Sequence, residues 1–111
     1  MHIAQLEEDL GLSRASIRFY EKEGLLSPER LANGYRDYSE EDLETLRRVK
    51  LLRALGLPLE DIKALQAGTL DLSAALRTQE GRLRREQRQR EAALSLCQTL
   101  EGEGVAYRDL E

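Results

Sequence analysis

Apolar residues recur at helical spacing near the start of the chain. A first helix is predicted over residues 3–10, because one of its faces carries three apolar side chains: Ile3, Leu6 and Leu10. Gly11 can end it in a left-handed conformation. A second helix is predicted over residues 14–23, with Ser13 as its N-cap. The candidates for its inward side are Ala15, Ile17 and Tyr20. Two short helices joined by a tight turn containing glycine form a helix-turn-helix pattern.

The next segment has the composition of a β-hairpin. Pro28 biases Ser27 toward extended geometry, and Asn33-Gly34 is a strong turn dipeptide. The predicted strands are residues 25–26 and 35–38. Because two strands are not stable alone in water, we expect this small wing to lean on the neighbouring helices.

Helical spacing then returns. Ser39 and three following acidic residues are typical of a helix start, and Gly56 can end this helix. Its apolar positions are Leu43, Leu46, Val49, Leu52 and Leu55. Pro58 begins a further short helix that ends at Gly68, with Leu59, Ile62 and Leu65 inward. The pattern predicts a mainly α domain over residues 1–70.

A single long helix is predicted over residues 72–100, roughly 43 Å at 1.5 Å per residue. Its apolar stripe consists of Leu72, Leu76, Leu83, Leu94, Cys97 and Leu100. A lone helix with so narrow a stripe is unstable in water, so we expect a second copy to complete a two-stranded coiled coil. The alternative is a frayed, solvated tail. Three parts are predicted along the chain. Residues 1–70 form the helix-turn-helix domain with its wing, and residues 71–101 form a dimerisation helix. Residues 102–111 form a tail or the start of a linker to a further domain.

Composition argues against catalysis. The 111 residues include one His and one Cys, with no glycine-rich phosphate loop. His2 is interpreted as a solvated residue and Cys97 as a small apolar one, so we predict no enzyme, no cofactor and no metal site. No apolar run is long enough for a membrane span, and a cytoplasmic protein is expected.

The positions of the cationic side chains point to nucleic acid. Arg14 and Arg18 share one face of the second helix, Arg36 lies in the wing, and Arg53 lies late in the third helix. In winged helix-turn-helix proteins the second helix enters the major groove, and flanking residues contact phosphates. The alternative is that these are ordinary solvated charges.

The motifs resemble the DNA-binding domain of the mercury-resistance-regulator (MerR) family of bacterial transcription regulators. They are Arg18-Phe19-Tyr20-Glu21, Gly24-Leu25-Leu26, Pro28, Arg30, Gly34-Tyr35-Arg36, Tyr38-Ser39, Leu52-Arg53-Ala54-Leu55-Gly56 and Pro58-Leu59-Glu60-Asp61-Ile62. They occur in the order and spacing of that family. The long helix from Leu72 looks like the family's antiparallel dimerisation helix.

The resemblance implies a DNA interface and a mechanism. The implied DNA-binding residues are Ser13, Arg14, Ser16, Arg18 and Tyr20 on the second helix, Arg30, Arg36 and Tyr38 in the wing region, and Arg53 in the second wing. It further implies a homodimer that binds a palindromic site in double-stranded promoter DNA. Such a dimer bends and untwists the DNA to control transcription by RNA polymerase.

Two departures from the family pattern bear on function. Glu7 stands where relatives usually carry a small residue, so we expect it to tilt outward or to pair with Arg14 or Arg18. No sensor cysteines or ligand-binding domain are present, which leaves a ligand-gated activator whose sensor was cut away and a sensorless repressor as alternatives. Sequencing the reading frame past Glu111 would separate them. A dimeric helical adaptor that binds protein, without DNA binding, is a further alternative.

The charge balance does not exclude DNA. The net charge is −4, and residues 1–70 carry 10 Lys and Arg against 13 Asp and Glu. The acids gather at helix starts, whereas the bases gather on the second helix, the wing and Arg53. This distribution predicts weak non-specific affinity and dependence on two linked half-sites.

Overall fold

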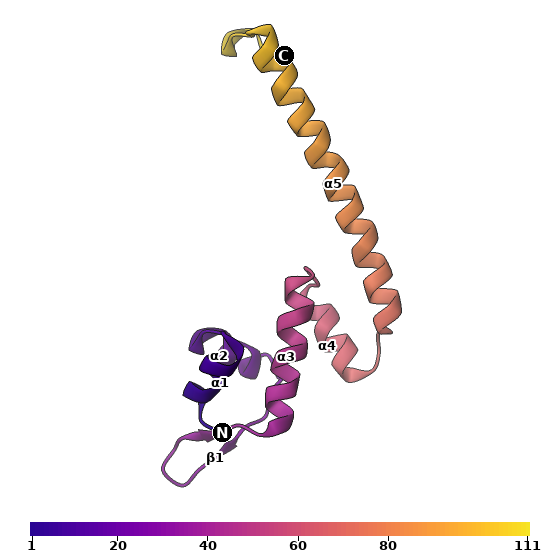
Figure 1. Ribbon diagram of the computed structural model, residues 1–111. Helices are drawn as coiled ribbons and strands as arrows, with labels where there is room; N and C mark the ends of the chain where they lie inside the picture. The colour runs from indigo at the N-terminus through magenta and orange to yellow at the C-terminus, as the bar shows by residue number, and fades with distance from the viewer. The chain divides into compact units, whose positions relative to one another are not determined.

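The computed structural model describes all 111 residues as two units, Met1–Leu72 and Ser73–Glu111. The elements in chain order are α1 (Ile3–Leu10), α2 (Arg14–Lys22), β1 (Glu29–Arg30), β2 (Arg36–Asp37), α3 (Glu40–Ala54), α4 (Leu59–Ala67), α5 (Leu72–Glu103) and the 3-10 helix η1 (Tyr107–Asp109). Figure 1 shows their order along the chain. This mainly helical fold, with a β-hairpin wing and a long C-terminal helix, confirms the predicted fold class.

The helix-turn-helix forms as the apolar pattern predicts, with one correction. Gly11 adopts φ 66° after α1, and the Ser13 side chain caps α2. The three apolar residues of α1 are buried, but α2 buries only Ile17 fully. Tyr20 is half-buried, and Ala15 is exposed, contrary to the prediction. Residues two apart on a helix point to nearly opposite sides, so Ala15 cannot share the inward face of Ile17.

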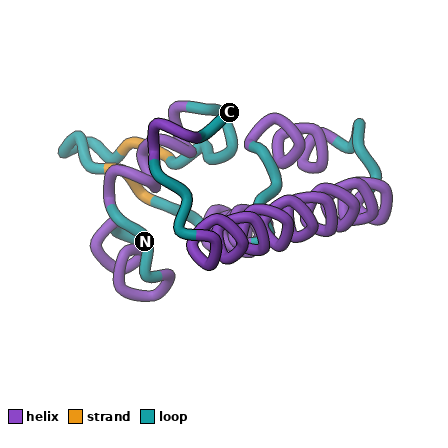
Figure 2. Tube along the Cα trace, turned by 90° about the horizontal axis from the view of Figure 1, so that it is seen from above, coloured by secondary structure: helices purple, strands orange, loops and turns teal.

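The wing uses a later first strand than the sequence suggested. Figure 2 shows the two short strands in orange. They pair antiparallel, with Glu29 opposite Asp37 and Arg30 opposite Arg36. The predicted strand at residues 25–26 is wrong: the first strand lies at Glu29–Arg30, and Leu25 and Leu26 are buried instead. Two consecutive leucines gain more from burial than a two-residue strand in an exposed hairpin could provide. The charged residues that follow them form the strand instead.

The core of the first unit lies between α1, α2, α3 and the base of the wing. It consists of Ile3, Leu6, Leu10, Ile17, Leu26, Tyr38, Leu43 and Leu46. In Figure 1, α1 and α2 lie on one side of α3, and α4 lies on the other. The Lys50 ammonium in α3 donates to the Leu10 carbonyl at the end of α1, where a cation is favoured. The Tyr38 amide donates to the Met1 carbonyl (2.8 Å) and thereby attaches the wing to the segment before α1.

The start of α3 and both ends of α4 match their predicted signals. Ser39 and Asp42 form a reciprocal capping box at the start of α3. Pro58 precedes α4, and Gly68 ends it in the left-handed conformation. Leu43, Leu46 and Val49 are buried on α3, whereas Leu52 is half-buried and Leu55 is exposed. The apolar side chains of α3 therefore point into the core only over the first three turns of the helix.

The second unit is dominated by α5, which is 32 residues long. It extends one turn beyond the predicted end, because Gly104 (φ 64°), rather than Gly102, is the left-handed residue that follows it. The six predicted stripe residues all lie within α5, and in the single chain Leu72, Leu76, Leu83, Leu94 and Cys97 are exposed. None of the helices is both long enough and apolar enough to span a membrane.

Candidate nucleic-acid interface

The start of α2 is held by the two serines predicted to contact DNA. The Ser13 hydroxyl oxygen accepts from the Ser16 amide (3.1 Å), and the Ser13 hydroxyl donates to the Ser16 hydroxyl (2.9 Å). Ser13 is exposed and Ser16 is half-buried. Both hydroxyls therefore have a structural role at the helix start, next to the exposed side of α2.

Arg14 and Arg18 are exposed one turn apart on α2. Arg14 donates through Nε to Oε1 of Glu7 in α1 at 2.8 Å, so Glu7 is half-buried and paired. This confirms the expected pairing of Glu7. Arg18 forms no ion pair or hydrogen bond with the rest of the chain. Its guanidinium retains all of its donors for a ligand.

The hairpin register sorts the charges of the wing by face. Residues directly opposite one another in an antiparallel pair point to the same side, and neighbours along a strand point to opposite sides. Arg30 and Arg36 therefore share one face, and Glu29 and Asp37 share the other. Like charges placed directly opposite destabilise a hairpin. A second arginine on that face costs stability and concentrates positive charge where a phosphate could bind.

Glu21 of α2 is bonded to the wing. The Arg36 Nε donates to Glu21 Oε2 at 2.9 Å, and the Tyr38 hydroxyl donates to Glu21 Oε1 at 3.2 Å. Burial, reinforced by the Glu21 carboxylate, raises the pKa of Tyr38 to about 12. These bonds join the far end of α2 to β2 and to the residue that follows it.

Three of the predicted arginines meet at one cavity. A hollow of about 270 Å³ is lined by Arg14 and Arg18 from α2 and Arg36 from β2, together with His2, Ile3, Gly34 and Tyr35. Three arginines and no acidic residue line it, although the first unit is acidic overall. Guanidinium groups match the geometry of phosphate oxygens, so the cavity is suited to a polyanion.

The remaining predicted DNA-binding residues lie apart from this cavity. Arg30 is exposed in β1, and Tyr20 is half-buried against the core. Tyr38 is only 2% exposed, so its ring belongs to the core. Arg53 is exposed and donates through Nη1 to the Leu57 carbonyl (3.2 Å), which places it at the turn between α3 and α4.

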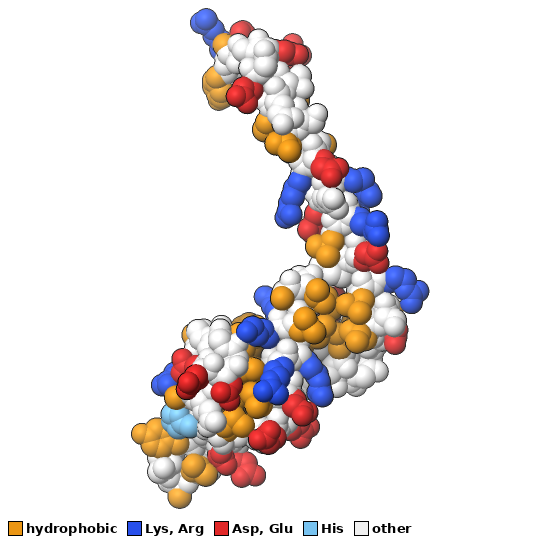
Figure 3. All heavy atoms as spheres, viewed as in Figure 1, with side chains coloured by type: hydrophobic (Ala, Val, Ile, Leu, Met, Phe, Trp, Pro, Cys, Tyr) orange, Lys and Arg blue, Asp and Glu red, His pale blue; other side chains and the backbone are white.

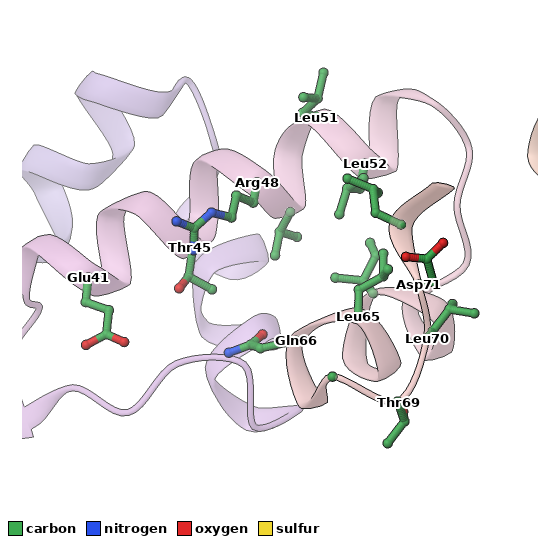
Figure 4. Close-up of a pocket in the computed structure, with 14 residues that line it drawn as sticks. Glu41, Thr45, Arg48, Leu51, Leu52, Leu65, Gln66, Thr69, Leu70 and Asp71 are labelled. Carbon is green, nitrogen blue, oxygen red and sulfur yellow. The ribbon is translucent and has the colours of Figure 1, made fainter. Parts of the chain in front are cut away.

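A larger groove of about 1,040 Å³ lies along α3, α4 and the segment after α4 (Figure 4). In the close-up, Leu52 from α3 and Leu65 from α4 point toward one another. Leucines make up much of its lining, and none of the predicted DNA-binding residues contributes to it. The hydrophobic patch over α3 and α4 in Figure 3 includes exposed leucines of this groove.

Comparison with known proteins identifies the family. Residues 1–69 match the family model described as MerR HTH family regulatory protein. The chain belongs to this family. Its members are transcription regulators rather than enzymes, which agrees with the prediction that the chain has no catalytic function. The matched region contains every residue predicted to bind DNA.

Relatives and solved structures agree with this assignment. The transcriptional regulator HmrR of Rhizobium leguminosarum bv. viciae is 43% identical over 67 residues, which are 60% of this chain and 52% of HmrR. MtaN, the N-terminus of the Bacillus subtilis multidrug transporter activator, is 31% identical with a TM-score of 0.77, over 90% of this chain and 97% of MtaN. HiNmlR, a MerR family regulator lacking the sensor domain and bound to promoter DNA, is 27% identical with a TM-score of 0.59, over 100% of this chain and 96% of HiNmlR.

The chain spans about half the length of HmrR and of the Bacillus subtilis regulator AdhR. No group of three or more His, Cys, Asp or Glu side chains is arranged to hold a metal ion. Cys97, the single cysteine, is exposed on α5.

Three residues that the sequence did not indicate as site residues lie at the cationic cavity or are bonded to an arginine that lines it. His2 is exposed, as expected for a solvated residue, and it also lines the cavity, where its Nδ1 accepts from the Ala4 amide (3.1 Å) as the N-cap of α1. Tyr35 was assigned to a strand, yet its ring lies 5.8 Å from that of His2 at the cavity. Glu21 was treated only as a motif residue. The one sequence signal for a role of Glu21 was its place in the Arg18–Glu21 motif, three residues after an arginine on the same helix.

Proposed function

We propose that this chain binds double-stranded promoter DNA through α2 and the wing, and that it does so as a homodimer in the cytoplasm. The observation that carries the proposal is the convergence of Arg14, Arg18 and Arg36 on one cavity. These residues come from two elements and are separated by up to 22 positions in the sequence, so a random distribution of solvated charges would not bring them together.

The arrangement supports distinct tasks for the two elements. Arg18 is unpaired on the exposed side of α2, where a recognition helix presents side chains to base edges in the major groove. Arg36 and Arg30 share one face of the wing, which is suited to the adjacent phosphates. Among the structural relatives, HiNmlR was solved on promoter DNA, and it carries the same fold.

The dimer is proposed from α5. Five of its stripe residues, Leu72, Leu76, Leu83, Leu94 and Cys97, fall within roughly a sixth of the helix circumference at 3.6 residues per turn. All five are exposed in the single chain, so no other part of the chain covers the stripe. A second copy of α5 would bury it.

Charge along α5 supports an antiparallel pair. Residues 72–90 carry six arginines against two glutamates, whereas residues 91–103 carry three glutamates and no basic residue. Figure 3 shows the basic side chains gathered in the middle part of this helix. An antiparallel arrangement places Arg77 and Arg82 of one copy beside the segment after residue 90 of the other, which carries no basic residue, and a parallel arrangement places each of them beside its own counterpart.

Two linked DNA-binding units would span a palindromic promoter site, and deforming the DNA between the half-sites would control transcription by RNA polymerase. The sensorless repressor and the ligand-gated activator both use this interface, so the reading frame past Glu111 remains the way to separate them.

The test is selection from a randomised duplex pool, followed by titration of the enriched and the mixed-sequence duplexes at several salt concentrations. The wild type should enrich a palindrome. Arg18→Ala should weaken binding by about ten-fold or more and relax base preference, because a base contact is worth roughly 1–3 kcal/mol. Arg36→Ala should weaken all sequences by similar factors and flatten the salt dependence.

Arg48→Ala is the matched control. Arg48 is an exposed arginine of α3 with a loose ion pair to Glu44 at 3.7 Å, and it does not line the cationic cavity. Its removal should leave affinity nearly unchanged. Equal, salt-independent binding by the wild type and both cavity variants would contradict the proposal and favour the protein-binding adaptor.

A further inference from the structure

One arginine of the cationic cavity is ion-paired with Glu7, a residue of α1 that does not itself line the cavity. Arg14 lines the cavity and donates through Nε to Glu7 at 2.8 Å. The two side chains are 47% and 33% exposed, respectively. The carboxylate therefore occupies one edge of a guanidinium that faces the proposed DNA surface, and solvent reaches the pair.

The three cavity arginines differ in how firmly they are held. Arg36 and Glu21 are 26% and 20% exposed, and Tyr38 donates a further bond to the same carboxylate. Arg18 has no partner in the chain. Arg14 alone has a single, solvent-accessible ion pair. Exposed pairs of this kind contribute little to stability, so another anion can replace the carboxylate at small cost.

We propose that Glu7 competes with a DNA phosphate for the guanidinium of Arg14, and thereby limits the affinity of this interface for the DNA backbone of any sequence. The inference rests on the proposed DNA-binding function and adds a residue that sets its strength. When DNA binds, Arg14 exchanges the carboxylate for a phosphate, and the freed Glu7 adds a negative charge beside the backbone. Both consequences lower affinity.

The test compares Glu7→Gln with Glu8→Gln. Glu8 follows Glu7 on α1, is exposed and forms no ion pair, so its substitution removes the same charge without releasing an arginine. A mixed-sequence duplex long enough for two half-sites is titrated by fluorescence anisotropy across a salt series. Glu7→Gln should bind about two- to five-fold more tightly. Its salt dependence should steepen by about one phosphate contact. Glu8→Gln should change both quantities much less.

Repeating both substitutions in an Arg14→Ala background isolates the pair, because the Glu7 effect should then nearly vanish. Glu7→Ala serves as a second variant, with circular dichroism confirming the helical content of each protein. Equal gains from Glu7→Gln and Glu8→Gln, or a Glu7 effect that persists without Arg14, would overturn this inference and leave the DNA-binding function intact. Failure of every protein, the wild type included, to bind any duplex would instead overturn the proposed function together with the inference.

Discussion

The Arg36 guanidinium in β2 donates to the Glu21 carboxylate in α2, across 15 positions of sequence. This bond fixes the wing against the far end of the helix-turn-helix. The same carboxylate accepts from the Tyr38 hydroxyl, so one acidic side chain joins a wing arginine and a core aromatic ring. A two-stranded hairpin is not stable alone, and this connection is one reason that the wing keeps a defined position.

Replacing Glu21 by glutamine should loosen the wing. The substitution preserves side-chain size and removes the charge that offsets half-buried Arg36. We expect a loss of about 1–2 kcal/mol in the free energy of unfolding, measured by urea denaturation, because a charge-assisted bond is lost. In an Arg36→Gln background the loss should be smaller, since the two residues act together.

The control for this experiment is Glu44→Gln. The Glu44–Arg48 pair is an i,i+4 pair with both side chains more than half exposed, and such pairs contribute less than about 0.5 kcal/mol. Equal losses from the two glutamine variants would show that Glu21 has no special connection to the wing.

Tyr38 should make stability depend on pH under alkaline conditions. Its pKa is raised from 10.0 to about 12 in the folded protein, first by burial and then by Glu21. The folded state therefore holds the proton more tightly than the unfolded state. The stabilisation is fully present below pH 10 and is lost as pH rises toward 12. The loss should reach about 2–3 kcal/mol, from 1.36 kcal/mol per pKa unit.

Urea unfolding at a series of pH values between about 9 and 12 measures this loss. Tyr38→Phe cannot lose a phenolic proton, so its stability curve should be flatter over this window. Tyr107, which is 91% exposed, provides the control, because Tyr107→Phe should retain the wild-type slope. A Tyr38→Phe variant with the wild-type slope would contradict the assignment.

The sequence predicted the helices well because their signals are local. Caps such as Ser13 and Ser39, and the apolar spacing of α1 and α3, are determined within a few residues. The first strand of the wing was misplaced, since the competition between burial of Leu25 and Leu26 and strand pairing is settled by tertiary packing. The ion pairs of the cavity arginines could be predicted from the sequence only in part. The Glu7–Arg14 pair could be anticipated across seven positions, but the Glu21–Arg36 bond and the cavity depend on how α2 packs against the wing.

The stripe on α5 predicts a difference between two neighbouring leucines. Leu94 lies on the stripe and Leu96 lies nearly opposite, yet they are 60% and 58% exposed in the single chain. Leu94→Asp should therefore yield a monomer in sedimentation experiments, as should Leu76→Asp and Leu83→Asp, because a buried charge without a partner is costly. Leu96→Asp should remain a dimer. If all three stripe variants remain dimers, the dimer interface lies outside the stripe.

The single cysteine offers a test of strand orientation in the proposed dimer. If the apolar ends of two antiparallel α5 helices cover one another, Leu76 of one copy lies near Cys97 of the other, and the two Cys97 residues are roughly 30 Å apart. Disulfides require Cα atoms within about 7 Å. The wild type should therefore give no cross-linked dimer under mild oxidation, whereas Leu76→Cys should.

A parallel dimer gives the opposite result. It would place the two Cys97 residues side by side on the stripe, and the wild type itself would cross-link on non-reducing gels. Leu96→Cys is the control, since its added cysteine lies on the opposite face of α5 and should give no cross-link beyond that of the wild type in either dimer. Cross-linking by the wild type at low protein concentration would contradict the antiparallel pairing, because the two Cys97 residues lie within disulfide distance only in the parallel arrangement.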